Sequence, residues 1–153
     1  LIPEESASFS TLPLINAGDK NEEKPYLPFF STDDFIAHLG FSPPLPTWLP
    51  PQWHFIEYGL WSFSQDIAFS AVYEHPNLSY LSYHYQATTQ PVPRQQIRLP
   101  DIPGKMLANG LEVYFSTEEG VLTAVWQKGN ARYELSGSIT QKEAEKIILS
   151  VTE

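Results

Sequence analysis

The stretch that decides the fold is residues 30–53, FSTDDFIAHLGFSPPLPTWLPPQW. Thr32 or Ser31 can cap a helix whose first turn holds two aspartates, because carboxylates favour the positive end of the helix dipole. Gly40 suits the left-handed position that ends a helix. The apolar positions between cap and glycine form a single stripe, Phe35, Ile36 and Leu39. The sequence therefore predicts one short amphipathic helix before Gly40.

A proline-rich connector follows this helix. Prolines stand at 43, 44, 46, 50 and 51. Proline lacks the backbone N–H and fixes φ, so the chain is predicted to run extended over 41–51. Trp48 lies inside this extended piece, and a large apolar side chain normally needs a cover. We interpret Trp48 as the residue that pins the connector to the core, with ligand stacking as the alternative.

Residues 1–28 differ in composition from the rest of the chain and are predicted to be a flexible or loosely docked arm. They are polar or charged without a sustained period, apart from an apolar island at 12–15 that could lie against the domain. Residues 29–153 form the single predicted domain. The sequence opens with Leu1 rather than methionine, a hint that a targeting or membrane segment was removed. No apolar run approaches the ~18 residues of a membrane helix.

Alternation with a period of two predicts strands after the connector. The runs 53–61, 67–74 and 78–86 are rich in aromatic and β-branched residues. In the third run, Leu81, Tyr83 and Tyr85 are expected on one face, and Tyr80, Ser82 and His84 on the other. Residues 87–103 read as a long loop in which only 96–99 could add a strand.

Two further hairpins are predicted downstream. Asn109-Gly110 lies between the apolar runs of 105–115, and both residues accept positive φ. The runs 121–127 and 131–137 are joined by a turn at 128–130. In the last strand, alternation places three side chains on the solvated face, Arg132, Glu134 and Ser136.

A capping box predicts the C-terminal helix. Thr140 and Glu143 have the required spacing. One apolar stripe follows, made by Ala144, Ile147, Ile148 and Val151. The predicted fold is therefore α+β: a single curved, mainly antiparallel sheet of about six or seven strands, with the C-terminal helix packed on one face and the short N-terminal helix at the edge.

Charge and composition exclude several classes of partner. The net charge is −9, and no lysine or arginine occurs between Pro25 and Pro93. The nine basic residues are interleaved with acids, so we expect neither nucleic acid nor an anionic membrane surface as a partner. The absence of cysteine excludes disulfides and thiolate metal sites, and it indicates no particular redox compartment.

The sequence predicts no catalytic, cofactor-binding or metal-binding residue. It contains no phosphate loop, zinc-protease motif or nucleophile elbow. His54 could meet His84 only if their strands pair in the right register. Glu118 and Glu119 adjoin each other in a predicted hairpin loop, where carboxylates are usually solvated. We expect a non-enzyme, without cofactors.

The aromatic content exceeds what a core of this size requires. Tyrosines on the outer face of a sheet make good contact surfaces. Core packing accounts for most of the rings, and the possible interaction surface is predicted at Trp61, Tyr80, Tyr83 and Tyr85. A groove for cell-wall glycan or lipid is the alternative.

The order of these features resembles an uncharacterised bacterial domain family. The resemblance covers about 29–153 and is carried by FSTDDFIAHLGF, PLPTWLPPQW, NGLEVYF, VLTAVWQ and TQKEAEKIILSV. Here Pro51 and Gln52 stand where the family more commonly has an acidic residue and glycine. The family occurs mainly in Gram-positive bacteria, as the extracytoplasmic end of membrane-anchored regulators of the anti-sigma-factor type or of lipoproteins. It implies no catalytic residue.

The resemblance implies a function and a location. We expect a non-catalytic, extracytoplasmic sensing or interaction domain of a membrane-anchored regulator, at the cell surface, with a protein, peptide or cell-envelope component as partner. Contact with a membrane is expected only through a segment outside this sequence. A lipoprotein-like carrier of a small apolar ligand is the alternative and a hydrolase the third. The identity of the partner and the oligomeric state do not follow from the sequence.

Overall fold

A computed structural model describes residues 26–63, 66–88 and 103–151. In this part of the chain, two helices accompany one sheet. The elements are β1 (Leu27–Phe29), α2 (Thr32–Leu39), β2 (His54–Phe63), β3 (Asp66–Glu74), β4 (Tyr80–Thr88), β5 (Lys105–Met106), β6 (Glu112–Glu118), β7 (Val121–Lys128), β8 (Ala131–Gly137) and α3 (Gln141–Leu149). This confirms the α+β class.

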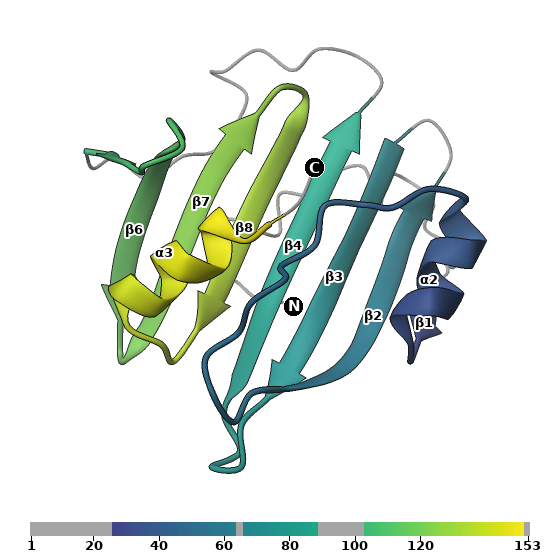
Figure 1. The fold of residues 1–153 in the computed structure, drawn as a ribbon, viewed down its shortest axis with the longest axis horizontal. Helices are drawn as coiled ribbons and strands as arrows, with labels where there is room; N and C mark the ends of the chain where they lie inside the picture. Colours follow the sequence, from purple (N-terminus) through teal and green to yellow (C-terminus); the bar gives the residue numbers. More distant parts are fainter. Residues whose placement is uncertain (1–25, 64–65, 89–102, 152–153) are drawn as a thin grey trace.

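The sheet has eight strands in the order β1-β2-β3-β4-β8-β7-β6-β5, and each neighbouring pair is antiparallel. Two meanders, β1 to β4 and β5 to β8, are joined where β4 pairs with β8 in the centre (Figure 1). The prediction of six or seven strands was therefore too low. The strand that sequence patterns missed is β1, whose three residues are too few to show a period and pair with the edge of β2.

The sheet begins at Leu27, two residues before the predicted start of the domain. Residues 1–25 lie outside the described part, as do the possible strand at 96–99 and most of the surrounding loop.

One face of the sheet, here called the front face, carries both helices. In Figure 1, α3 and the connector cross in front of the sheet, and α2 lies at the edge formed by β1 and β2. The core between these layers is aromatic: Phe35 of α2 stacks on Tyr58 with ring centroids 4.5 Å apart, and Trp126 stacks on Tyr133 at 5.2 Å. Ile147 and Ile148 of α3 are also buried there.

Local signals set the ends of both helices. Ser31 caps α2, since its hydroxyl accepts a hydrogen bond from the Asp34 amide at 3.1 Å, and Gly40 ends the helix with φ 84°. Thr140 and Glu143 form the predicted capping box of α3. The prediction of both helices is confirmed.

The connector is tied to α3 by a cluster of hydrogen bonds around Ser150. The Ser150 hydroxyl oxygen accepts hydrogen bonds from the amides of Thr47 (3.0 Å) and Trp48 (3.1 Å), and the Thr47 hydroxyl donates to the Ser150 carbonyl at 2.8 Å. The Trp48 ring is half-buried, with the Lys146 ammonium 4.5 Å from its centroid. Trp48 therefore pins the connector, as predicted.

Three of the hairpin turns hold a glycine with positive φ: Gly110, Gly120 and Gly129. The Asn109-Gly110 hairpin forms, but only Gly110 takes positive φ, at 90°. The Asn109 side chain instead accepts a hydrogen bond from the Leu111 amide at 3.2 Å. At the start of β2, Gln52 has φ 75°, a conformation that favours glycine.

Candidate interaction surface

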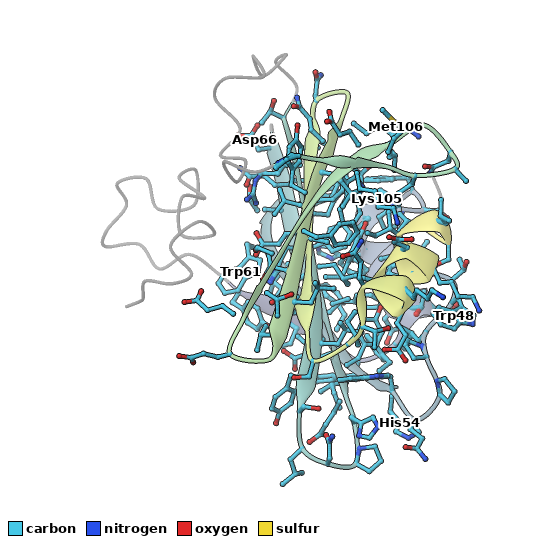
Figure 2. All side chains as sticks on the ribbon, turned by 90° about the vertical axis from the view of Figure 1, so that its left-hand side faces the viewer. Trp48, His54, Trp61, Asp66, Lys105 and Met106 are labelled. Carbon is cyan, nitrogen blue, oxygen red and sulfur yellow. The ribbon has the colours of Figure 1, made fainter. Side chains whose placement is uncertain are left out.

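The second face of the sheet, here called the back face, carries neither α2 nor α3. Figure 2 shows the two faces edge-on: Trp48 lies on the side of the helices, and Trp61 lies on the opposite side of the sheet. Antiparallel sheets commonly bury one face and hydrate the other, so a polar back face is expected. Two polar residues of the back face are nevertheless buried rather than hydrated: Ser70 is 4% exposed and Glu134 is 7% exposed.

Strand register arranges the back face in three rows. Directly opposed residues on neighbouring strands point to the same side of a sheet, so each row brings side chains from distant parts of the chain together. The rows are Ala68-Gln86-Arg132-Gln127, Ser70-His84-Glu134-Val125 and Val72-Ser82-Ser136-Thr123. Hydrogen-bonding side chains predominate, and Arg132 is the only basic residue in the rows.

A partly buried ion pair occupies the middle of these rows. The Arg132 Nη1 donates to Glu134 Oε1 at 3.2 Å, and the two side chains are 11% and 9% exposed. Burial raises the pKa of Glu134, and the charge and hydrogen bond of Arg132 partly oppose this shift. Burial, followed by the positive charge of Arg132, lowers the pKa of His84 to about 4. His84 is therefore neutral at pH 7.

Three polar atoms in this cluster are closed off from water and have no hydrogen-bond partner within the described ranges: Arg132 Nε, Arg132 Nη2 and Gln127 Oε1. Gln127 is oriented by its Nε2, which donates to the Gly129 carbonyl at 3.3 Å. Buried polar atoms without partners are rare in native proteins. All three atoms belong to Arg132 and Gln127, which pair directly across β7 and β8, so we take the surroundings of this pair as the candidate site.

Aromatic rings border the cluster. A shallow hollow beside it is lined by Trp61, Ala68, Phe69, His84, Tyr85, Gln86 and Arg132. The Tyr26 ring packs against Trp61 with centroids 4.5 Å apart, and it covers Gly59, where any Cβ would collide with that ring. The Tyr26 hydroxyl donates a hydrogen bond to Glu57. Burial, with the Glu57 bond and charge adding to it, raises the pKa of Tyr26 to about 12.

The structure separates the four residues of the predicted interaction surface. Trp61 and Tyr80 lie on the back side and are 37% and 59% exposed. Tyr83 points to the front face, is fully buried and donates to the Pro44 carbonyl at 2.7 Å, so its inclusion was wrong. Tyr85 also points to the front, where it packs partly buried against the core. Alternation had placed Tyr83 and Tyr85 correctly on a face distinct from that of Tyr80, but it could not tell which face the helices cover.

The other candidates from the sequence do not come together. His54 pairs with Glu74 at the end of β3, whereas His84 pairs with Ser70 in the middle of that strand, so the two histidines do not meet. Within the described ranges, no group of three or more histidine or acidic side chains is placed to hold a metal ion. Glu118 and Glu119 are exposed at the β6–β7 turn.

Sequence reasoning missed the cluster itself. Alternation assigned Arg132 and Glu134 to the solvated face, whereas both side chains are largely buried. The sequence did contain one relevant signal: Arg132 and Glu134 are two residues apart, so their side chains lie on the same face of β8. Only the pairing of β8 between β4 and β7 brings them beside His84, Gln86 and Gln127.

These observations define an α+β domain built on an open antiparallel sheet, with one helix-covered face and one polar face. Residues 43–151 match the family described as Domain of unknown function (DUF4367), and the chain belongs to that family. The match begins at the connector, so it leaves β1 and α2 outside, although the resemblance in the sequence reached back to residue 29.

Neither the curated proteins nor the solved structures contain a match to this chain. The helices that the structure describes are all too short, or too polar, to cross a membrane.

Proposed function

We propose that this domain is a non-catalytic interaction module that binds a protein or peptide partner through its back face. The observation that supports the proposal is that no helix of the described residues covers this face, while Trp61 and Tyr80 on it are 37% and 59% exposed. Exposed aromatic rings beside polar side chains are typical of a protein interface.

The surroundings of the cluster suit a protein partner. Trp61 and Tyr80 flank the polar rows with large, partly exposed rings, and aromatic residues are enriched in protein interfaces. A small hollow next to Trp61 reaches the polar rows at His84, Gln86 and Arg132. The side chains of the rows include both hydrogen-bond donors and hydrogen-bond acceptors, as recognition of a polypeptide requires.

The carrier alternative requires an apolar pocket between sheet and helices. In the described part of the chain, stacked rings fill that layer: Phe35 lies against Tyr58, and Trp126 against Tyr133. The hollow beside Trp61 lies on the other face of the sheet and is lined by aromatic rings together with His84, Gln86 and Arg132. These features favour peptide binding over carriage of an apolar ligand.

A selection experiment tests the binding proposal. Random peptides displayed on phage are selected against the immobilised full chain, and enriched sequences are synthesised and titrated by fluorescence polarisation. We expect Trp61→Ser and Tyr80→Ser to weaken binding by about tenfold or more, since tryptophan and tyrosine side chains dominate the binding energy of protein interfaces. Lys142→Gln, on the exposed side of α3, is the matched control and should bind normally. Enriched peptides that bind all variants equally would refute the proposed face.

We also propose that the domain is extracytoplasmic and transmits a signal as part of a membrane-anchored regulator of Gram-positive bacteria. The support is the resemblance of the sequence motifs of residues 29–153 to extracytoplasmic domains of such regulators, together with the net charge of −9. Intact cells expressing the complete gene product are treated with an external protease. Cleavage of the domain while a cytoplasmic marker stays intact would support this location. Protection of the domain until the cells are lysed would contradict it.

A further inference from the structure

We infer that the open edge of β6 is a docking site for an extended peptide segment of a partner protein, with a basic residue opposite Glu118. This edge is the side of residues 115–118 that faces away from β7, here called the β6 rim. It is distinct from the back face, so the inference goes beyond the proposed function. The observation behind it is that β7 pairs with residues 114–118, whereas β5, on the other side of β6, pairs only with residues 112 and 113.

Strand register decides which main-chain groups point to the β6 rim. The β6–β7 hairpin closes at Glu118 across a two-residue turn, so the N–H and C=O groups of Glu118 face β7. Successive residues of a strand direct these groups to alternate sides, so those of Phe115 and Thr117 face away from β7. The start of the strand agrees with this alternation, because the Leu111 carbonyl accepts a hydrogen bond from the Leu107 amide, on the β5 side, at 2.8 Å.

Four main-chain groups therefore point outward along the β6 rim, the N–H and C=O groups of Phe115 and Thr117. No other strand of the described part of the chain pairs with them. Residues 116–118 are exposed, and Phe115 is partly buried because its ring packs against the core. Figure 2 looks onto the sheet from the β6 side, with Lys105 and Met106 of β5 in the upper half of the view.

The β6 rim lacks the features that usually protect a sheet edge, which are proline, lysine, a bulge or a covering helix. The opposite edge of this sheet has two of them, because β1 contains Pro28 and lies beside α2. Residues 115–118 contain neither proline nor lysine, and their register with β7 runs without a bulge. The β6 rim is therefore open to pairing with an added strand, a known mode of peptide recognition.

Charge favours a basic peptide over a second copy of this chain. Glu118 and its neighbour in the turn, Glu119, are exposed, and β6 contains no basic residue. Lys105 of β5 is already bound to Glu145 at 2.7 Å. A second copy would bring the same acidic strand and a net charge of −9. A peptide with lysine or arginine opposite Glu118 forms a favourable cross-strand pair instead.

The two faces of the sheet specify a second position of the peptide. In antiparallel pairing, the peptide residue opposite Phe115 lies on the same face as that ring, where an apolar β-branched side chain adds contact. The residue opposite Glu118 comes three positions earlier in the peptide. The peptide that fits is therefore a basic residue followed, three positions later, by valine or isoleucine.

A peptide and two N-methylated isomers of it test the β6 rim in the full chain. The probe is acetyl-Lys-Thr-Thr-Val-Thr-amide, with its lysine opposite Glu118 and its valine opposite Phe115. A methyl group on the valine nitrogen removes the donor to the Phe115 carbonyl. A methyl group on the central threonine nitrogen, opposite Ser116, points away from β6 and is the matched control. Each peptide is titrated while the Phe115 and Thr117 amide signals are followed by ¹H–¹⁵N NMR.

We expect the probe and the control isomer to shift both amide signals saturably, with a Kd in the millimolar range for a short peptide held by four main-chain hydrogen bonds. The valine isomer should bind about tenfold more weakly or not at all. Thr117→Pro removes one outward N–H without touching the pairing with β7, so it should also weaken the probe about tenfold. Thr117→Val keeps that N–H and should bind as the parent chain does.

A charge exchange tests the basic position of the peptide. Glu118→Lys should weaken the probe and strengthen a peptide in which glutamate replaces the lysine. Equal affinities of the two peptides for the parent chain would refute the basic position. Trp61→Ser should leave probe binding unchanged, because Trp61 lies on the back face, at the far end of the strand order from β6.

The inference is overturned if the two N-methylated isomers bind equally, or if no peptide shifts the Phe115 and Thr117 signals. These comparisons use the parent chain and do not need a folded Thr117→Pro variant. A dimer in sedimentation analysis that Thr117→Pro dissociates would also overturn it, because the β6 rim would then pair with a second copy. Probe binding that is lost in Trp61→Ser and kept in Thr117→Pro would refute the β6 rim while supporting the proposed back-face function.

Discussion

Replacement of Ser150 by alanine is expected to release the connector from α3. The Ser150 hydroxyl uses its full hydrogen-bonding capacity: it donates to the Ile147 carbonyl at 2.6 Å and accepts from the amides of Thr47 and Trp48. The Ile147 carbonyl keeps the Ser150 amide as a donor at 3.0 Å after the change. The loss therefore falls on the two connector amides.

The size of the effect follows from their surroundings. The bond to the Trp48 amide is partly buried, and leaving such a donor without a partner costs about 1–3 kcal/mol. The bond to the Thr47 amide is exposed, so water replaces the hydroxyl there and the net loss is about 0.5 kcal/mol. Together they lower the free energy of unfolding by about 2 kcal/mol. With a urea slope of about 2 kcal/mol/M, the midpoint drops by about 1 M.

Equilibrium urea unfolding and amide hydrogen exchange measure this effect. Exchange at Thr47 and Trp48 should accelerate in Ser150→Ala, since the connector opens locally before the domain unfolds. Ser138→Ala, an exposed serine in the turn before α3, is the control. The reasoning is refuted if Ser150→Ala unfolds within about 0.3 kcal/mol of that control and leaves both exchange rates unchanged.

Three further predictions concern the core, a strained turn and a buried histidine. Ile147→Ala should lower the free energy of unfolding by about 2–5 kcal/mol and Ile147→Val by about 0.5–1.5 kcal/mol, since the side chain is fully buried; equal urea midpoints for the two variants would contradict this. Gln52→Gly should raise the thermal midpoint, because it relieves a positive φ worth about 1 kcal/mol, and a lowered midpoint would count against strain at this turn. The pKa of His84 is lowered in the folded state to about 4 from the ordinary 6.5, so the unfolded chain binds protons first and stability should fall as pH decreases from 6.5 to 4. Urea midpoints at pH 7 and pH 5 should differ less in His84→Gln than in the parent chain, and an equal difference in both would refute this assignment.

Local signals in the sequence predicted much of the fold. The cap, apolar stripe and glycine stop of residues 31–40 act within one turn of helix, and so does the Thr140 capping box. The turn glycines act over two or three residues. These features do not need the rest of the protein, so they can be recognised without it.

The sequence patterns were less informative about how the two meanders combine. The β4–β8 pair joins residues 81–87 to 131–137 across some fifty positions, and no local pattern encodes that pairing. The same limitation explains the error over Tyr83. Alternation fixes which side chains share a face, but the choice of the face that α3 and the connector cover depends on long-range packing.

The sequence by itself determined the α+β class, the helix ends, the connector pinned by Trp48 and the hairpin turns, because each depends on contacts between near neighbours along the chain or on backbone chemistry. Only the tertiary structure decided the eight-strand order and the cluster of His84, Gln127, Arg132 and Glu134. That cluster forms because β8 lies between β4 and β7, and the pairing closes the guanidinium and the Gln127 amide off from water. Burial and register are properties of the assembled sheet, so the candidate site emerges only at that level.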